Sequence, residues 1–205
     1  MILTEGTKTE PYHFEGFKKA IESTGRKEVL IEIIGVGQAT TKLLPFADEL
    51  IEKYHLEKAD IWLLTDKDDF PDDQFNQLVI QCVRRNRTCH LNNYWHCAWS
   101  NECFELWFIL HFSFYQAAAT REDYYCLLKE QFRKLGFTGY RKNSPDIFDL
   151  LVRYGSPKSA IRFARKLYEE KKSLSPAKAL PCTTVYELVM ELARYLPSDL
   201  KDRFF

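Results

Sequence analysis

Apolar runs and amphipathic segments alternate along the first half of the chain. Short β-branched or apolar runs between turn residues are typical of strands, and apolar positions three or four apart are typical of helices. The runs "EVLIEIIG" and "ADIWLLTD" therefore predict strands, and "DDQFNQLVIQCVRRN" predicts a helix. In chain order we predict a strand at 2–4, a helix within 5–23, a strand at 28–35, a helix at 39–55 capped by Thr40 or Thr41, a strand at 59–66, a helix at 72–86, a strand at 90–100 and a helix at 101–112.

From Arg121 onward the pattern changes to helices alone, predicted at 121–136, 146–155, 159–173 and 181–196, with "SLSPAKALPC" as a flexible connection. Strands that alternate with helices indicate a mostly parallel sheet covered on both faces. We therefore predict an α/β fold with a Rossmann-like core at 1–115. A helical region at 116–205 should pack over or beside the carboxyl ends of the strands.

Composition restricts the possible functions less than the pattern of hydrophobic and polar positions does. Of 205 residues, 45% are hydrophobic and 15% aromatic, which is ample for a packed core. Lys plus Arg equals Asp plus Glu at 29 each, so no global positive field favours nucleic acid, although a local basic surface is compatible with neutrality. The six cysteines and the absence of a targeting segment predict a reduced, cytoplasmic location. The most apolar stretch, 103–115, is too short to span a bilayer, which predicts no membrane association.

An acidic cluster follows the third predicted strand, in "LLTDKDDFPDD" at 63–73. Like charges this close destabilise one another unless water or a cation separates them. Asp66 and Asp68 form a D-x-D at the strand end, which suits a hard cation such as Mg²⁺. Asp72 and Asp73 are placed to begin the next helix, where acidic residues are favourable, and Asp69 fits either role.

A second acidic position follows the first strand, in "TEG" at 4–6. For Glu5–Gly6 alone, an ordinary turn is the favoured interpretation, since glycine permits a sharp turn. In parallel sheets, however, ligands bind at the carboxyl ends of strands. Glu5, Asp66 and Asp68 all fall at such ends, so we expect them to meet.

Three other patterns have mainly structural interpretations. Cys89, His90, His96, Cys97 and Cys103 are zinc-type ligands, but adjacent strand residues face opposite ways and no C-x₂-C pair exists, so zinc is disfavoured. "GVGQAT" at 35–40 lacks a complete phosphate-binding fingerprint, and a tight turn is the default. "RRNR" at 84–87 ends a helix, where basic residues favour the dipole and are also able to reach phosphate.

Glu-Gly after the first strand, together with D-x-D two strands later, resembles the TOPRIM domain of primases, topoisomerases and related nucleases. More narrowly, "TEGTKTEPYHFEGF", "DKDDF" and "SNECFELWFILHF" resemble the RloB family of small TOPRIM-like proteins, found among bacterial restriction and phage-defence genes. The resemblance covers nearly the whole chain. One departure is Glu102, where the family pattern carries proline.

The resemblance implies roles for individual acidic residues. Glu5 matches the TOPRIM glutamate, a metal ligand or acid/base catalyst, while Asp66 and Asp68 match the metal-binding D-x-D. Glu10 falls where the nuclease branch places a further acidic residue and is the candidate ligand of a second metal.

The "SNECFELWFILHF" stretch contributes two more candidates. Glu105, early in a helix that follows a strand, is able to point at the metal site, and we weigh a catalytic and a structural role equally. His111 lies one turn beyond Trp107 and is a candidate substrate contact. A histidine on such a face is nevertheless more often a hydrogen-bonded core residue.

The resemblance implies a phosphodiesterase, dependent on Mg²⁺ or Mn²⁺, that cuts RNA (tRNA in particular) or DNA in anti-phage defence. Lys142, in "YRKNSP", is the candidate phosphate contact from the helical half. The neutral net charge favours a protein partner or activator from a defence system, and homo-oligomerisation is left open. The alternatives are a non-catalytic regulatory or nucleic-acid-binding subunit that keeps the TOPRIM scaffold, and nucleotidyl transfer.

Overall fold

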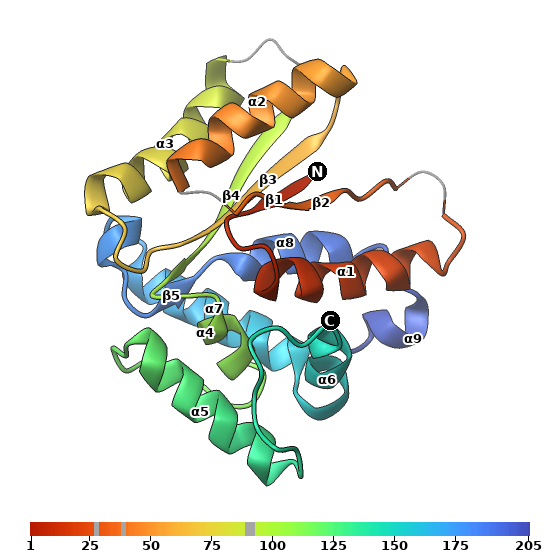
Figure 1. Ribbon diagram of the computed structural model, residues 1–205, viewed down its shortest axis with the longest axis vertical. Helices are drawn as coiled ribbons and strands as arrows, with labels where there is room; N and C mark the ends of the chain where they lie inside the picture. Colours follow the sequence, from red (N-terminus) through yellow and green to blue (C-terminus); the bar gives the residue numbers. More distant parts are fainter. Residues whose placement is uncertain (27–28, 38–39, 89–92) are drawn as a thin grey trace.

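A five-stranded sheet forms the centre of the protein in a computed structural model, which describes residues 1–26, 29–37, 40–88 and 93–205 (Figure 1). The strand order is β2-β1-β3-β4-β5; the first three pairings are parallel and β5 is antiparallel to β4. The predicted α/β fold with a mostly parallel sheet is confirmed. The strands are β1 (Ile2–Thr4), β2 (Ile33–Gly35), β3 (Asp60–Asp66), β4 (Tyr94–Asn101) and β5 (Cys182–Thr183).

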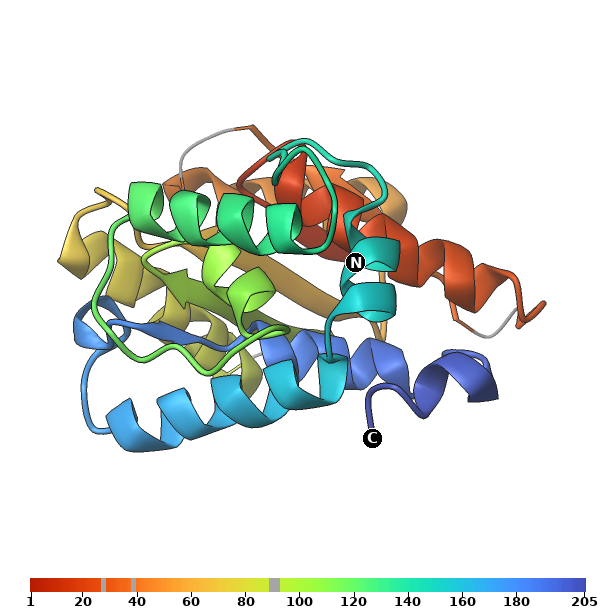
Figure 2. The same ribbon diagram turned by 90° about the horizontal axis from the view of Figure 1, so that it is seen from below.

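Helices cover both faces of the sheet (Figures 1 and 2). The bounds of the α-helices are α1 (Thr9–Glu22), α2 (Leu43–Tyr54), α3 (Asp72–Thr88), α4 (Glu105–Ile109), α5 (Arg121–Lys134), α6 (Ile147–Tyr154), α7 (Pro157–Lys171), α8 (Val185–Ala193) and α9 (Ser198–Lys201), and those of the 3₁₀ turns are η1 (Thr40–Lys42) and η2 (Pro176–Lys178). Helices α2 and α3 pack on one face, and α1 and α8 on the other.

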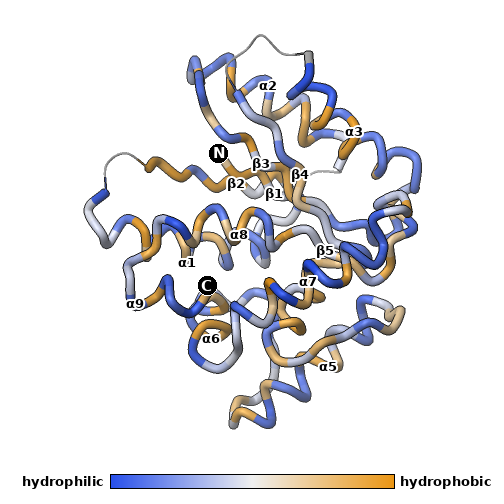
Figure 3. The backbone as a smooth tube through the Cα atoms, turned by 180° about the vertical axis from the view of Figure 1, so that it is seen from behind, coloured by the Kyte–Doolittle hydropathy of each residue, from blue (hydrophilic) through white to orange (hydrophobic). Residues whose placement is uncertain are grey.

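Alternation along β3 explains how one strand serves both faces. Leu63 packs in the cluster beneath α2 and α3, whereas Trp62 and Leu64 pack in the larger cluster with α1 and α8. Successive side chains of a strand point to opposite faces, so a continuous apolar run is what a doubly covered strand requires. Figure 3 shows the same apolar character in β2 and the segment before it.

The strand register places the predicted site residues at the carboxyl ends of neighbouring strands. Thr4 of β1 is level with Leu64 of β3, and the Glu5 amide donates to the Leu64 carbonyl over 3.1 Å. Glu5 and Asp66 therefore leave neighbouring parallel strands at the same end. This is the arrangement predicted from the sequence.

The second half of the chain is not purely helical, so that prediction is wrong at one element. Cys182 and Thr183 form β5, with Thr183 level with Ser100 of β4. The two hydroxyls are 2.9 Å apart, and the short strand covers an edge of β4 that would otherwise lack backbone partners. The preceding segment, predicted as a flexible connection, contains η2, where the Ala177 amide donates to Asn76 over 3.0 Å.

Element ends also differ from the sequence prediction. Within the predicted strand 28–35, only Ile33–Gly35 pairs as a strand, while residue 28 lies outside the described residues. The predicted helix 101–112 contracts to α4, because β4 continues to Asn101 and the helix does not begin until Glu105; beyond its end, the His111 carbonyl accepts from the Ser156 amide at 2.8 Å. No helix among the described residues is long and apolar enough to cross a membrane.

Candidate active site at the carboxyl ends of the strands

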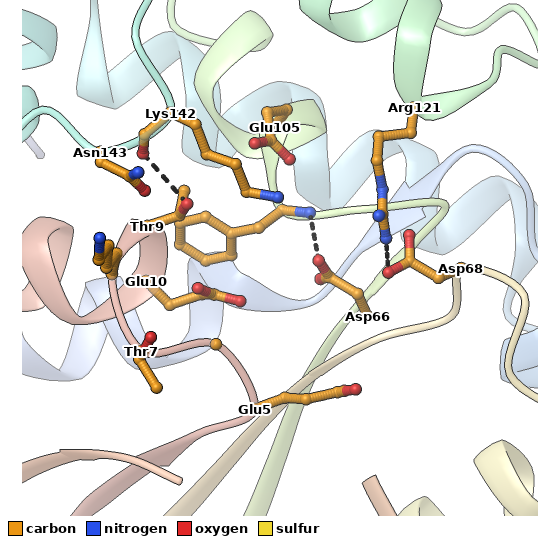
Figure 4. Close-up of a pocket in the computed structure, with 13 residues that line it drawn as sticks. Glu5, Thr7, Thr9, Glu10, Asp66, Asp68, Glu105, Arg121, Lys142 and Asn143 are labelled. Carbon is orange, nitrogen blue, oxygen red and sulfur yellow. Dashed lines mark hydrogen bonds and ion pairs between the residues drawn. The ribbon is translucent and has the colours of Figure 1, made fainter. Parts of the chain in front are cut away.

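A cavity of about 280 Å³ opens where β1 and β3 end (Figure 4). Its walls come from both halves of the chain: the loop after β1 and the start of α1, the end of β3, the start of α4, the start of α5 and the segment before α6. The lining residues are Glu5, Gly6, Thr7, Lys8, Thr9, Glu10, Asp66, Asp68, Phe104, Glu105, Arg121, Lys142 and Asn143. Five carboxylates and three cationic side chains thus share one small space.

Glu5 is held by two threonine hydroxyls. Thr40 Oγ1 donates to Glu5 Oε2 at 2.7 Å, and Thr65 Oγ1 donates to the same oxygen at 2.9 Å. The sequence predicts Thr40 or Thr41 as a helix cap; instead, both lie in η1, which precedes α2, and the Thr40 hydroxyl contacts Glu5 at the site. These bonds fix the carboxylate in one orientation at the cavity wall.

Gly6 makes room for Glu10 rather than supplying an unusual turn. A Cβ at Gly6 would lie 2.4 Å from Glu10 Oε2, which is far inside van der Waals contact. Glu10 is the second residue of α1 and is only 8% exposed. The glycine therefore allows the Glu10 carboxylate to approach the loop that carries Glu5.

Nearby, Gly37 has φ +64°, as expected for the tight turn predicted in "GVGQAT"; residues 38–39 of that motif lie outside the described residues.

Asp66 and Glu10 occupy an environment that disfavours two negative charges. The Phe104 amide donates to Asp66 Oδ2 at 3.1 Å. Burial, then repulsion from Glu10 and Glu105, nevertheless holds the pKa of Asp66 well above its usual range. Burial and the nearby carboxylates Glu105 and Glu5 raise the pKa of Glu10 to about 7, against the opposing charge of Lys142. Such crowding is relieved by a cation or a proton.

Asp68 has a different partner. Its Oδ2 pairs with the guanidinium of Arg121, the first residue of α5. Its Oδ1 is buried and has no hydrogen-bond partner among the described residues. The backbone at Asp68 has φ +37°, in the left-handed region that aspartate adopts more readily than most residues other than glycine, and its amide donates to the Glu102 carbonyl at 3.0 Å.

The other aspartates of the acidic cluster at 63–73 lie outside the cavity. Asp72 begins α3, as predicted, and pairs with Lys67 at 3.1 Å and Lys178 at 2.6 Å. Asp73 follows it in the first turn of the helix. Asp69, which the sequence left open, does not line the cavity. The cluster therefore divides into Asp66 and Asp68 at the cavity and three aspartates beside it.

Glu105 projects into the cavity from the first turn of α4 and is 2% exposed. The Tyr140 hydroxyl donates to Glu105 Oε1 at 3.3 Å. Lys142 extends over the cavity toward the carboxylates in Figure 4, and its carbonyl accepts from Thr9 Oγ1 at 3.1 Å, tying this segment to α1. The helical half thus completes the wall, as predicted.

Sequence reasoning missed Arg121 and the groups that orient the carboxylates, Thr40, Thr65 and Tyr140. Of these four residues, only Arg121 has a feature in the sequence that could have suggested its role. A cationic residue at the first position of a helix opposes the helix dipole, and this local mismatch points to a tertiary partner.

His111 is the one predicted site residue that the structure places elsewhere. It is 4% exposed and does not line the cavity. Its Nδ1 lies 2.9 Å from the Trp107 carbonyl, and burial lowers the pKa of the imidazole to about 4. A neutral, core-packed histidine has no access to a phosphate. We therefore assign His111 to the core and not to substrate binding.

The zinc-type residues do not gather where the structure describes them. His96 stacks on Trp62 with ring centroids 4.2 Å apart, while burial of Cys103 and its proximity to Glu105 raise the pKa of that thiol. Cys89 and His90 lie outside the described residues. In the "RRNR" segment, Arg85 pairs with Asp48 and lies over the Trp95 ring, which supports its structural interpretation.

The cavity suits a hard divalent cation by the chemistry of its donors. All five candidate ligand side chains are carboxylates, Asp68 Oδ1 is a buried oxygen with no partner in the described part of the chain, and the absent Cβ of Gly6 leaves the space that Glu10 occupies. As the side chains stand, however, no three His, Cys, Asp or Glu residues in the described part of the chain converge closely enough to hold a metal. Binding would require a rearrangement of the carboxylates.

Comparison with known proteins identifies the family. Residues 1–192 match the family described as RloB-like protein. This chain belongs to the RloB-like family. No curated protein and no solved structure matches the chain. All residues that line the cavity fall inside the region that matches, so the site is part of the RloB-like sequence and not of an appended segment.

Proposed function

We propose that this RloB-like protein is a metal-dependent phosphodiesterase that cuts nucleic acid. The observation that carries the proposal is that Glu5, Asp66 and Asp68 from the strand ends line the same cavity as Arg121 and Lys142 from the helical half. Carboxylates that crowd together are suited to a divalent cation, and cationic side chains that line the same cavity are suited to a phosphate.

Glu5, Asp66 and Asp68 would hold the cation, and Glu10 is the candidate for a second. A bound Mg²⁺ or Mn²⁺ supplies positive charge that acidifies a water ligand and stabilises the departing oxygen. The protein contributes fixed positions: Thr40 and Thr65 orient Glu5, and the Phe104 amide orients Asp66.

Glu105 is our candidate to accept the proton of the attacking water, because Tyr140 orients its carboxylate toward the cavity. The water oxygen bonds to phosphorus, and the bond from phosphorus to the sugar oxygen breaks. The released oxygen takes a proton from solvent. Lys142 and Asn143 would contact the non-bridging phosphate oxygens during this step.

The substrate class follows from the family resemblance, which supports RNA, tRNA in particular, or DNA, in defence against phages. The test incubates the purified protein with total tRNA, single-stranded DNA and plasmid DNA, each with Mg²⁺, Mn²⁺ or EDTA. We expect cleavage of one of these with a divalent metal and none in EDTA or with Asp66→Asn. Cleavage that persists in EDTA would refute the metal-dependent mechanism.

A non-catalytic, nucleic-acid-binding role is the second candidate. It is favoured by the pairing of Asp68 with Arg121, which engages one of the presumed ligands, and by the absence of three converging ligands among the described residues. Binding of tRNA or DNA without cleavage in either metal would support this role over the nuclease.

A further inference from the structure

Arg121 is poorly placed for the stability of its own helix. It is the first residue of α5, where the helix dipole favours negative charge. Thr120 and Asp123 already satisfy this end through reciprocal hydrogen bonds, with 2.9 Å between the Thr120 amide and Asp123 Oδ2. Local helix formation therefore does not favour an arginine here, and the contacts that engage its side chain are tertiary.

The tertiary contact is Asp68, and it satisfies only half of that carboxylate. Arg121 pairs with Oδ2, while the buried Oδ1 has no partner among the described residues. The backbone of Asp68 is left-handed, at φ +37°, a conformation that aspartate adopts more readily than most residues other than glycine. An aspartate whose buried oxygen is left without a partner by the described residues is poorly explained as a structural ion pair. It is better explained as a ligand whose second partner is a cation.

Arg121 differs from the nearby lysines in how it is engaged. Lys67 pairs with Asp72 outside the cavity, and Lys142 lies 5.8 Å over the Tyr125 ring. Arg121 lines the cavity, pairs with a candidate metal ligand and keeps 37% of its side chain exposed. Its planar guanidinium also binds phosphate oxygens in the same forked geometry as carboxylate oxygens.

We propose that Arg121 is an exchangeable counter-ion: it neutralises Asp68 in the cation-free protein, leaves when a divalent cation takes Asp68, and then binds a backbone phosphate of the nucleic-acid substrate. The inference rests on the proposed function for the identity of the substrate and deepens it. Metal and substrate binding are thereby coupled, because the same displacement that completes the metal site releases a phosphate ligand.

The first test measures Mn²⁺ binding by isothermal titration calorimetry without nucleic acid. Arg121→Ala and the milder Arg121→Gln remove the competitor for Asp68, so both should bind Mn²⁺ about two- to fivefold more tightly than the wild type, the range that a partly exposed ion pair supports. Arg133→Ala, which removes the same charge from the exposed far end of α5, is the matched control and should bind Mn²⁺ like the wild type. Unchanged or weaker Mn²⁺ binding by both Arg121 variants would overturn the proposal.

The second test is a double-mutant cycle on nucleic-acid binding in EDTA, which needs neither metal nor cleavage. The probes are a short fluorescent single-stranded DNA and the RNA of the same sequence. Asp68→Asn should free Arg121 and tighten binding severalfold, and this gain should disappear when Arg121→Ala is added. If Asp68→Asn raises nucleic-acid affinity equally with and without Arg121, the gain reflects net charge alone. That result would overturn the proposed transfer of Arg121 from Asp68 to a phosphate. Because the cycle is read in EDTA, failure of the nuclease assay would leave its result intact.

Discussion

Replacing Glu10 with glutamine should stabilise the metal-free protein at alkaline pH. Glu10 is buried beside Glu105 and Glu5, and its pKa is raised from 4.5 to about 7. Between these two values the folded protein keeps a proton that the unfolded chain has lost. The free energy of unfolding therefore falls as pH rises through this window and reaches its low plateau above about pH 7.

The size of the effect follows from the pKa difference. One pKa unit corresponds to about 1.4 kcal/mol, so ionised Glu10 costs the folded state about 3 kcal/mol as an order of magnitude. Glutamine keeps the shape of the side chain and carries no charge. In EDTA, Glu10→Gln should thus exceed the wild type by up to about 3 kcal/mol near pH 8, and by little near pH 4.5.

Urea unfolding followed by circular dichroism at both pH values measures the difference. Glu22→Gln, at the exposed end of the same helix, is the control, and its difference in stability from the wild type should be small and the same at the two pH values. Added Mn²⁺ should reverse the ranking near pH 8, because a cation stabilises the ionised wild-type site and has less to bind in the variant. A Glu10→Gln protein that is no more stable than the wild type in EDTA near pH 8 would refute the reasoning.

Three further outcomes are expected. Asp66→Asn should abolish metal-dependent cleavage and reduce the rise in melting temperature caused by Mg²⁺ or Mn²⁺, whereas Asp73→Asn should leave both unchanged. Identical behaviour of the two variants would show that the acidic cluster is a solvated loop and not a metal site. Lys142→Ala should weaken nucleic-acid binding and lower the slope of log K against log salt by about one, with Mn²⁺ affinity retained, and equal binding at low salt would remove it from the site. Gly6→Ala should lower both the stability and the Mn²⁺ affinity, because its Cβ would lie 2.4 Å from Glu10 Oε2 and push the carboxylate away. Unchanged Mn²⁺ affinity would show that Glu10 is not a ligand.

The sequence by itself determined the parallel sheet and the position of its acidic residues. Apolar runs with strand-like composition are local signals, and a carboxylate directly after such a run lies at the carboxyl end of the strand. Glu5, Asp66 and Asp68 were placed correctly for this reason, and the register of β1 against β3 confirms that they leave the sheet at one edge. Glu10 came from the family resemblance and Lys142 from the polar donors in "YRKNSP", and both line the cavity.

Only the tertiary structure decided which distant groups complete the cavity and which residues leave it. Arg121 meets Asp68 across more than fifty positions of sequence, and β5 pairs with β4 although its two residues resemble the start of a helix. His111 shares a helical spacing with Trp107 but turns into the core. Periodicity reports which face of an element is apolar, whereas these contacts depend on how separate elements pack, and packing is set by shape and charge across the whole chain.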